Sequence, residues 1–160
     1  MDFTTQMPSY LEFASTLTGV SQKVVGQAEL LGSYLQNYAK FADAASGPNT
    51  TFAVLNLYMM QRQQLSADQV VQYFINGKYD SLSPNSTWPF SLLVRNLNKF
   101  LLLGVWYDPT KPDDEGTIPT DAIYAQSLIW LIAQAQPTGA SKLAYGHWAD
   151  PPPPLNKLIG

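Results

Sequence analysis

The stretch PFSLLVRNLNKFLLLGVW, residues 89 to 106, constrains the fold more than any other part of the sequence. Pro89 suits the first position of a helix, because a backbone N–H at that position has no hydrogen-bond acceptor within the helix and proline therefore loses nothing by lacking one. The stretch then places five apolar residues on one helical face: Phe90, Leu93, Val94, Leu97 and Leu101. After Lys99 the residues are apolar on every side and cannot all point the same way. We expect a helix over Phe90 to Trp106 whose C-terminal half is covered on more than one side.

Further helical signals lie on both sides of this stretch. Ser66-Ala67-Asp68-Gln69 matches a capping box, Gly19 and Gly77 end apolar-periodic segments, and Thr120 can cap a last helix. The longest pattern starts at Ser21 and has one apolar face about six turns long. The expected helices outside 89–106 cover approximately residues 8–19, 21–46, 51–63, 66–77 and 121–135.

The segments together predict the fold class. No run shows sustained alternation of period two, and short connections favour antiparallel neighbours. We therefore expect an all-α protein, an irregular bundle of five or six helices in a single domain over 1–160. Residues 137–160 are expected to form an extended, proline-rich C-terminal strap.

The composition favours a partner protein over a polyanion. Charged residues make up 13% of the chain, about half the usual quarter. Interface cores are likewise poor in charge and rich in aromatic residues, although a low-charge secreted protein would also fit. The net charge is -3 and the nine basic residues look scattered, which argues against binding nucleic acid or phosphate.

Groups able to carry chemistry are few. The chain has no cysteine and one histidine, His147, too few for a zinc or iron site, and it lacks the motifs for nucleotides or for a serine nucleophile. Asp113, Asp114 and Glu115 are consecutive acidic residues between Pro112 and Gly116, which favours a solvated turn. A hydrolase using these carboxylates is a third, disfavoured hypothesis.

The sequence gives two expectations about location. Its longest apolar runs are too short to cross a bilayer, so we expect no direct membrane span. No basic, apolar leader stands at residues 1–3. The protein is therefore expected to stay where it is made or to be a processed form.

The C-terminal strap holds aromatic residues beside a proline run. Tyr145 and Trp148 precede Pro151 to Pro154, which can neither continue a helix nor enter a central strand. These aromatics could pack on the chain's own helices or clamp another subunit. Trp106 and Tyr107, at the end of the apolar helix, raise the same question. The predicted partner-binding residues are Trp106, Tyr107, Tyr145, Trp148, Asp150, Pro151 and Pro152.

Three patches resemble one known family. They are Phe13-Ala14-Ser15-Thr16-Leu17-Thr18-Gly19, Leu103-Gly104-Val105-Trp106-Tyr107 and Gly146-His147-Trp148-Ala149-Asp150-Pro151. In order and approximate spacing they resemble the small helical subunit of bacterial membrane-bound FAD-dependent sugar and polyol dehydrogenases, of the sorbitol, fructose and glucose dehydrogenase type. The third patch is the most specific, and the likeness covers most of the chain loosely.

The resemblance implies an accessory subunit with no cofactor of its own. Its partner would be a flavoprotein that holds FAD and oxidises the sugar or alcohol, and a multihaem cytochrome c would pass the electrons to quinone. The small subunit would be periplasmic, held at the inner membrane through its partners, and would help twin-arginine export of the flavoprotein. The alternative is a stand-alone helical interaction or scaffold domain of unrelated lineage.

Overall fold

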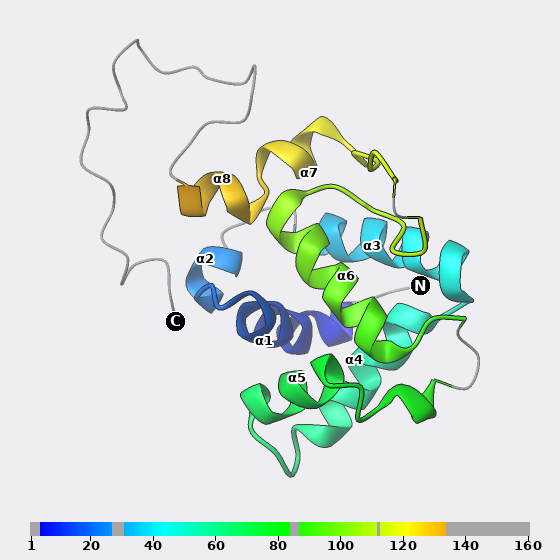
Figure 1. The fold of residues 1–160 in the computed structure, drawn as a ribbon. Helices are drawn as coiled ribbons and strands as arrows, with labels where there is room; N and C mark the ends of the chain where they lie inside the picture. Colours follow the sequence, from blue (N-terminus) through cyan, green and yellow to red (C-terminus); the bar gives the residue numbers. More distant parts are fainter. Residues whose placement is uncertain (1–3, 27–30, 84–86, 112, 134–160) are drawn as a thin grey trace.

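The computed structural model describes residues 4–26, 31–83, 87–111 and 113–133 (Figure 1). These residues form α-helices and two short 3-10 helices, and their one β feature is an isolated bridge between Trp106 and Thr117. The prediction of an all-α protein is confirmed. The expected strap, 137–160, lies outside the described residues. The elements are η1 (Thr4–Gln6), α1 (Met7–Thr18), α2 (Gln22–Gly26), α3 (Leu31–Ser46), α4 (Thr50–Gln61), α5 (Ala67–Ile75), η2 (Asp80–Leu82), α6 (Phe90–Leu103), α7 (Asp121–Ala125) and α8 (Leu128–Ala133).

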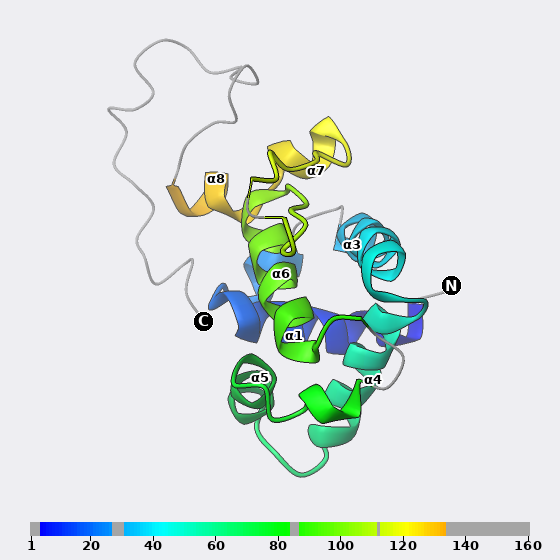
Figure 2. The same cartoon turned by 45° about the vertical axis from the view of Figure 1, so that its right-hand side comes forward.

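Helix α6 is the centre of the bundle. It contacts α1, α3, α4, α5 and α8, and both ribbon views show it running between the other helices (Figures 1 and 2). The apolar face predicted from the sequence is buried. In the C-terminal half, the ring of Phe100 packs against Tyr34 and Tyr38 of α3, whereas Leu101 lies beside Leu128 of α8. The expectation that its C-terminal half is covered on more than one side is therefore confirmed.

Aromatic rings and tyrosine hydroxyls join the helices around α6. The ring of Phe13 in α1 lies 4.7 Å from that of Tyr58 in α4 and 5.8 Å from that of Phe74 in α5. Tyr38 of α3 donates its hydroxyl to the Leu93 carbonyl at 2.6 Å, so a buried polar group is satisfied by the central helix. Burial raises the pKa of Tyr38 well above its ordinary value, and the hydroxyl remains a donor at physiological pH.

The predicted helix ends are confirmed where the signal is local. Gly19 follows α1 and donates its backbone N–H to Ser15 at 2.9 Å. Ser66 and Gln69 form the expected capping box at the start of α5, with reciprocal hydrogen bonds of 3.0 and 3.3 Å. Thr120 caps α7 by accepting the backbone N–H of Ile123 at 3.2 Å.

Three predicted helix lengths are wrong. Helix α6 ends at Leu103 instead of Trp106, because Gly104 takes a left-handed conformation with φ of 66° and closes the helix. The expected helix over 121–135 is split into α7 and α8. At the split, the Tyr124 carbonyl accepts both the Ser127 N–H and the Trp130 indole N–H.

The long helix expected over 21–46 is also two helices. Helix α2 packs on α1, whereas α3 packs on α4 and α6, so the two serve different parts of the bundle. Residues 27–30 between them lie outside the described residues. Within its described ranges the structure thus has eight α-helices, where the sequence predicted six.

Candidate functional site

Trp106 lies in the core. Its side chain is 6% exposed and stacks against Phe41 and Trp88, with ring centroids 5.3 and 6.0 Å away. Its backbone N–H and carbonyl both pair with Thr117, at 2.8 and 2.7 Å. The apolar surplus that suggested a partner surface is thus covered by rings from α3 and from the segment before α6. In this conformation Trp106 exposes very little surface to a partner.

Tyr107, the next residue, is half-exposed. The ammonium of Lys99 lies 3.7 Å from the centre of its ring. The Tyr107 carbonyl accepts the Asn96 side-chain amide at 2.7 Å, which ties the residue to α6. Tyr107 is therefore the one predicted partner-binding residue that the structure places at the surface within its described ranges. Tyr145, Trp148, Asp150, Pro151 and Pro152 lie outside those ranges, as does His147.

A hollow of about 310 Å³ opens beside Tyr107, and we call it the α6 hollow. One wall is a single face of α6, with residues spaced by three and four, and the other wall is the loop that follows Tyr107. The lining residues are Leu92, Arg95, Asn96, Lys99, Tyr107, Asp108, Pro109, Lys111 and Asp114.

The loop wall of the α6 hollow is fixed by two carboxylates. Asp108 accepts the backbone N–H and the hydroxyl of Thr110, at 3.0 and 2.6 Å, and pairs with Lys111 at 3.2 Å. The Thr110 hydroxyl and N–H, helped by Lys111, hold the pKa of Asp108 below its ordinary value. Asp114 accepts the Asp108 backbone N–H at 2.6 Å. The loop thus keeps its shape through side-chain to backbone bonds.

The acidic run beside this loop does not form a catalytic group. Asp114 is turned to the Asp108 backbone, whereas Asp113 and Glu115 are exposed. Within the ranges that the structure describes, no three His, Cys, Asp or Glu side chains come close enough to hold a metal ion. The arrangement fits the solvated turn expected from the sequence, with Asp114 as its internal hydrogen-bond acceptor.

Three of the nine basic residues line the α6 hollow, so the expectation that they are scattered is wrong here. Lys111 pairs with Asp108, and Arg95 donates to the Ile75 carbonyl at the end of α5, at 2.6 Å. In the described part of the chain, neither Arg95 nor Lys99 forms an ion pair with a carboxylate. The sequence did indicate that two of these cations lie side by side, since Arg95 and Lys99 are four residues apart on the polar side of a predicted helix.

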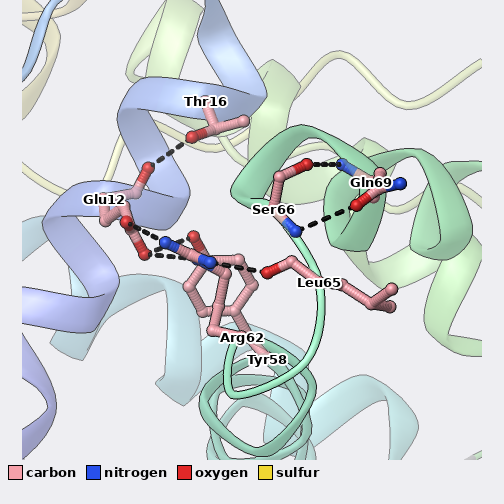
Figure 3. Close-up of polar contacts among 7 residues, drawn as sticks. All are labelled: Glu12, Thr16, Tyr58, Arg62, Leu65, Ser66 and Gln69. Carbon is pink, nitrogen blue, oxygen red and sulfur yellow. Dashed lines mark hydrogen bonds and ion pairs between the residues drawn. The ribbon is translucent and has the colours of Figure 1, made fainter.

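A second charged group, the Glu12–Arg62 cluster, joins α1 to α4 (Figure 3). Arg62 donates to both Glu12 oxygens, at 2.8 and 3.0 Å, and Tyr58 donates its hydroxyl to the same carboxylate at 2.7 Å. Arg62 also reaches the Leu65 carbonyl at 2.6 Å. The Arg62 hydrogen bonds hold the pKa of Glu12 below its ordinary value. Sequence reasoning did not find this cluster, because its partners are about fifty residues apart.

Comparison with known proteins identifies no relative: no protein-family model, curated protein or solved structure matches the chain. A search of the described helices for one long and apolar enough to cross a membrane finds none.

Proposed function

We propose that the chain is a non-catalytic accessory subunit that binds, stabilises and helps to export a periplasmic FAD-dependent dehydrogenase acting on sugars or alcohols. FAD belongs to the partner, and a multihaem cytochrome c would carry the electrons on to quinone. The observation that supports the proposal is that the partly buried carboxylates of the described residues form hydrogen bonds or ion pairs within the fold, so they are not free to act as catalytic groups.

Each partly buried carboxylate in the described ranges stabilises the fold. Glu12 binds Arg62, and Asp43 accepts the backbone N–H groups of Asn49 and Thr51 at the start of α4. Asp80 accepts the Ser91 backbone N–H at the start of α6, at 2.7 Å. Asp108 and Asp114 fix the loop of the α6 hollow, as described above. The other acidic residues in the described ranges are exposed: Asp68, Asp113, Glu115 and Asp121.

This division supports a binding role over catalysis. A general acid or base must reach the reacting atoms from a positioned site, with a pKa suited to the task. A carboxylate already committed to a helix end or a turn is poorly placed to do so. Such a protein acts by offering binding surfaces. One such surface is the half-exposed Tyr107 beside Arg95 and Lys99, which pair with no carboxylate of the described residues.

The class of partner comes from the sequence resemblance. Two of the three patches that carry it, 13–19 and 103–107, form the C-terminal ends of α1 and α6 and the turns that follow them. The third patch, 146–151, lies outside the described residues. Periplasmic location and twin-arginine export follow from the same resemblance and are part of the proposal.

Co-expression tests this function. We would tag the chain, co-express it with any flavoprotein whose gene lies beside its own, and follow size-exclusion chromatography by flavin absorbance. The proposal predicts one flavin-containing peak that holds both proteins. As a control, Leu82→Ala changes an exposed apolar residue of η2, away from the α6 hollow, and should leave that peak unchanged.

Two results would contradict the proposal in different ways. A native protein that purifies alone, colourless and monomeric, with no flavoprotein or cytochrome gene nearby, would exclude the accessory role. A stable complex with a partner that holds no flavin would instead favour the stand-alone interaction or scaffold domain.

A further inference from the structure

The strongest unexplained feature is a pair of like charges on α6. Arg95 and Lys99 are one helical turn apart and both are exposed. Like charges at this spacing repel each other, and an anion placed between them removes the repulsion. Neither side chain pairs with a carboxylate in the part of the chain that the structure describes.

The two carboxylates that line the α6 hollow are already engaged. Asp108 is bound by Thr110 and Lys111, and Asp114 holds the Asp108 backbone N–H. The α6 hollow thus contains three cations and two carboxylates in a chain whose net charge is -3. Its local charge is opposite to that of the whole molecule, which favours an acidic ligand.

The other lining groups narrow the class of ligand. Leu92 and Pro109 offer apolar contact at the walls, where the carbon stem of an acidic side chain could lie. Asn96 is 6% exposed, and its side-chain oxygen accepts no hydrogen bond from any described residue. Because Asn96 lines the hollow, a ligand N–H is one group that could satisfy this acceptor. A peptide with Asp or Glu supplies the carboxylate, the stem and the N–H together.

We propose that the α6 hollow binds an acidic peptide segment of the partner chain, with a carboxylate held by Arg95 and Lys99. This inference rests on the proposed function and names the chemistry that the partner must present. Its size agrees with this occupant, because hollows of about 300 Å³ hold small ligands or a few side chains. Polyanions with regularly repeated charge, such as nucleic acid, fit less well beside two fixed carboxylates.

The first test uses a synthetic acidic peptide, Gly-Glu-Asp-Glu-Gly, labelled with fluorescein, and its neutral counterpart Gly-Gln-Asn-Gln-Gly. Fluorescence anisotropy at low salt should show binding of the acidic peptide alone. The double variant Arg95→Gln with Lys99→Gln should weaken binding about tenfold or more, because it removes both charge-assisted contacts. The matched control, Lys23→Gln with Lys40→Gln, makes the same change in net charge at exposed positions elsewhere and should bind like the wild type.

Two controls separate a loss of peptide binding from a loss of folding. Arg95 donates a hydrogen bond to the Ile75 carbonyl, so we would also measure Lys99→Gln alone, since Lys99 lies over the Tyr107 ring and donates no hydrogen bond that joins helices among the described residues. Circular dichroism should give the wild-type helix content for every variant. Equal weakening in both double variants, equal binding of the neutral peptide, or no binding of the acidic peptide by folded wild type would each overturn the inference.

A second arm separates this inference from the proposed function. The flavoprotein should be retained by immobilised wild type and by the Lys23, Lys40 control, and retained poorly by the Arg95, Lys99 variant. If wild type and both variants retain it equally, the α6 hollow is not its docking point and the accessory role stands. If none retains it while the acidic peptide still binds through Arg95 and Lys99, the accessory role fails and carboxylate recognition stands.

Discussion

The Glu12–Arg62 cluster and the α6 hollow both bring basic side chains together with carboxylates, one at the contact of α1 with α4 and the other along α6. In the cluster, Arg62 has three close oxygen acceptors and Glu12 receives a further bond from Tyr58. In the hollow, Arg95 and Lys99 have no carboxylate partner among the described residues. The same residue types are therefore internally matched at one site and left with spare charge at the other.

This difference separates groups that hold the fold from groups available to a partner. A charge pair that already makes several charge-assisted hydrogen bonds within the protein has less to offer another molecule. A surface cation without a carboxylate contributes little to stability and can steer and hold an acidic partner. Mutations should therefore affect stability at the first site and binding at the second.

The largest expected effect is at Trp106, which lies directly before the hollow. Trp106→Ala removes a buried ring stacked on Phe41 and Trp88, and it should lower the free energy of unfolding by about 3–5 kcal/mol. Urea denaturation followed by circular dichroism would measure this loss. Leu82→Ala, at a position 52% exposed, should change it by less than about 0.5 kcal/mol. A fully stable Trp106→Ala protein would show that the ring belongs to a surface after all.

Gly104 comes next, because it ends α6 and starts the segment that leads into the hollow. An added Cβ would lie 2.8 Å from the Ile123 carbonyl oxygen, and φ is already left-handed at 66°. Gly104→Ala should lower the free energy of unfolding by about 2–5 kcal/mol, because backbone strain and steric crowding act together.

Gly19→Ala is the matched control for Gly104. Gly19 also has a left-handed φ, of 72°, but a Cβ there meets nothing within 4 Å. Gly19→Ala should therefore lower the free energy of unfolding only through backbone strain, by about 1–2 kcal/mol. Equal losses in the two variants, measured by the same urea titration, would contradict the close packing of α7 against the end of α6.

A smaller, pH-dependent effect is expected at Glu12. Its pKa is lowered in the folded state, so its contribution is complete above the unfolded value of about 4.3 and is lost as pH falls through the folded value. Glu12→Gln should cost about 1–2 kcal/mol at pH 7 and much less near pH 3. Urea titrations at both pH values would measure it, with Glu115→Gln as the exposed control. A cost that is the same at both pH values would rule out the charged pair as its source.

The smallest effect on stability should come from the hollow itself. Replacing Arg95 and Lys99 by glutamine should lower the free energy of unfolding by about 1 kcal/mol or less, since both side chains are exposed and the hydrogen bond lost is the one from Arg95 to the Ile75 carbonyl. Thermal unfolding would check this value. A large loss would show that the two cations hold the fold, as Arg62 does, and would erase the contrast between the two sites.

Local signals allowed much of the fold to be predicted. Gly19, the Ser66–Gln69 capping box and Thr120 act through residues at most four positions away, and the structure has all three. The end of α6 was not predictable in this way. Gly104 sits inside an apolar run that hides its role as a helix end. The close approach of Ile123 and Tyr124, which leaves no room for a Cβ at residue 104, depends on tertiary packing.

The candidate site was predictable only in part. Tyr107 was expected at a surface and is half-exposed, but Trp106 is covered by rings that the sequence could not place beside it. The meeting of Lys111 and Asp114 with Arg95 depends on how the loop folds back onto α6. The loop takes this path because the side chains of Asp108 and Asn96 form hydrogen bonds with its backbone. The spacing of residues in the sequence does not predict these bonds.

The stability of the flavoprotein with and without this chain tests the central claim most directly. The flavoprotein would be produced alone and together with the chain, and its FAD content and dehydrogenase activity followed over time. An accessory subunit predicts higher FAD content and slower loss of activity when the chain is present. Equal FAD content and equal rates of loss in the two preparations would contradict it.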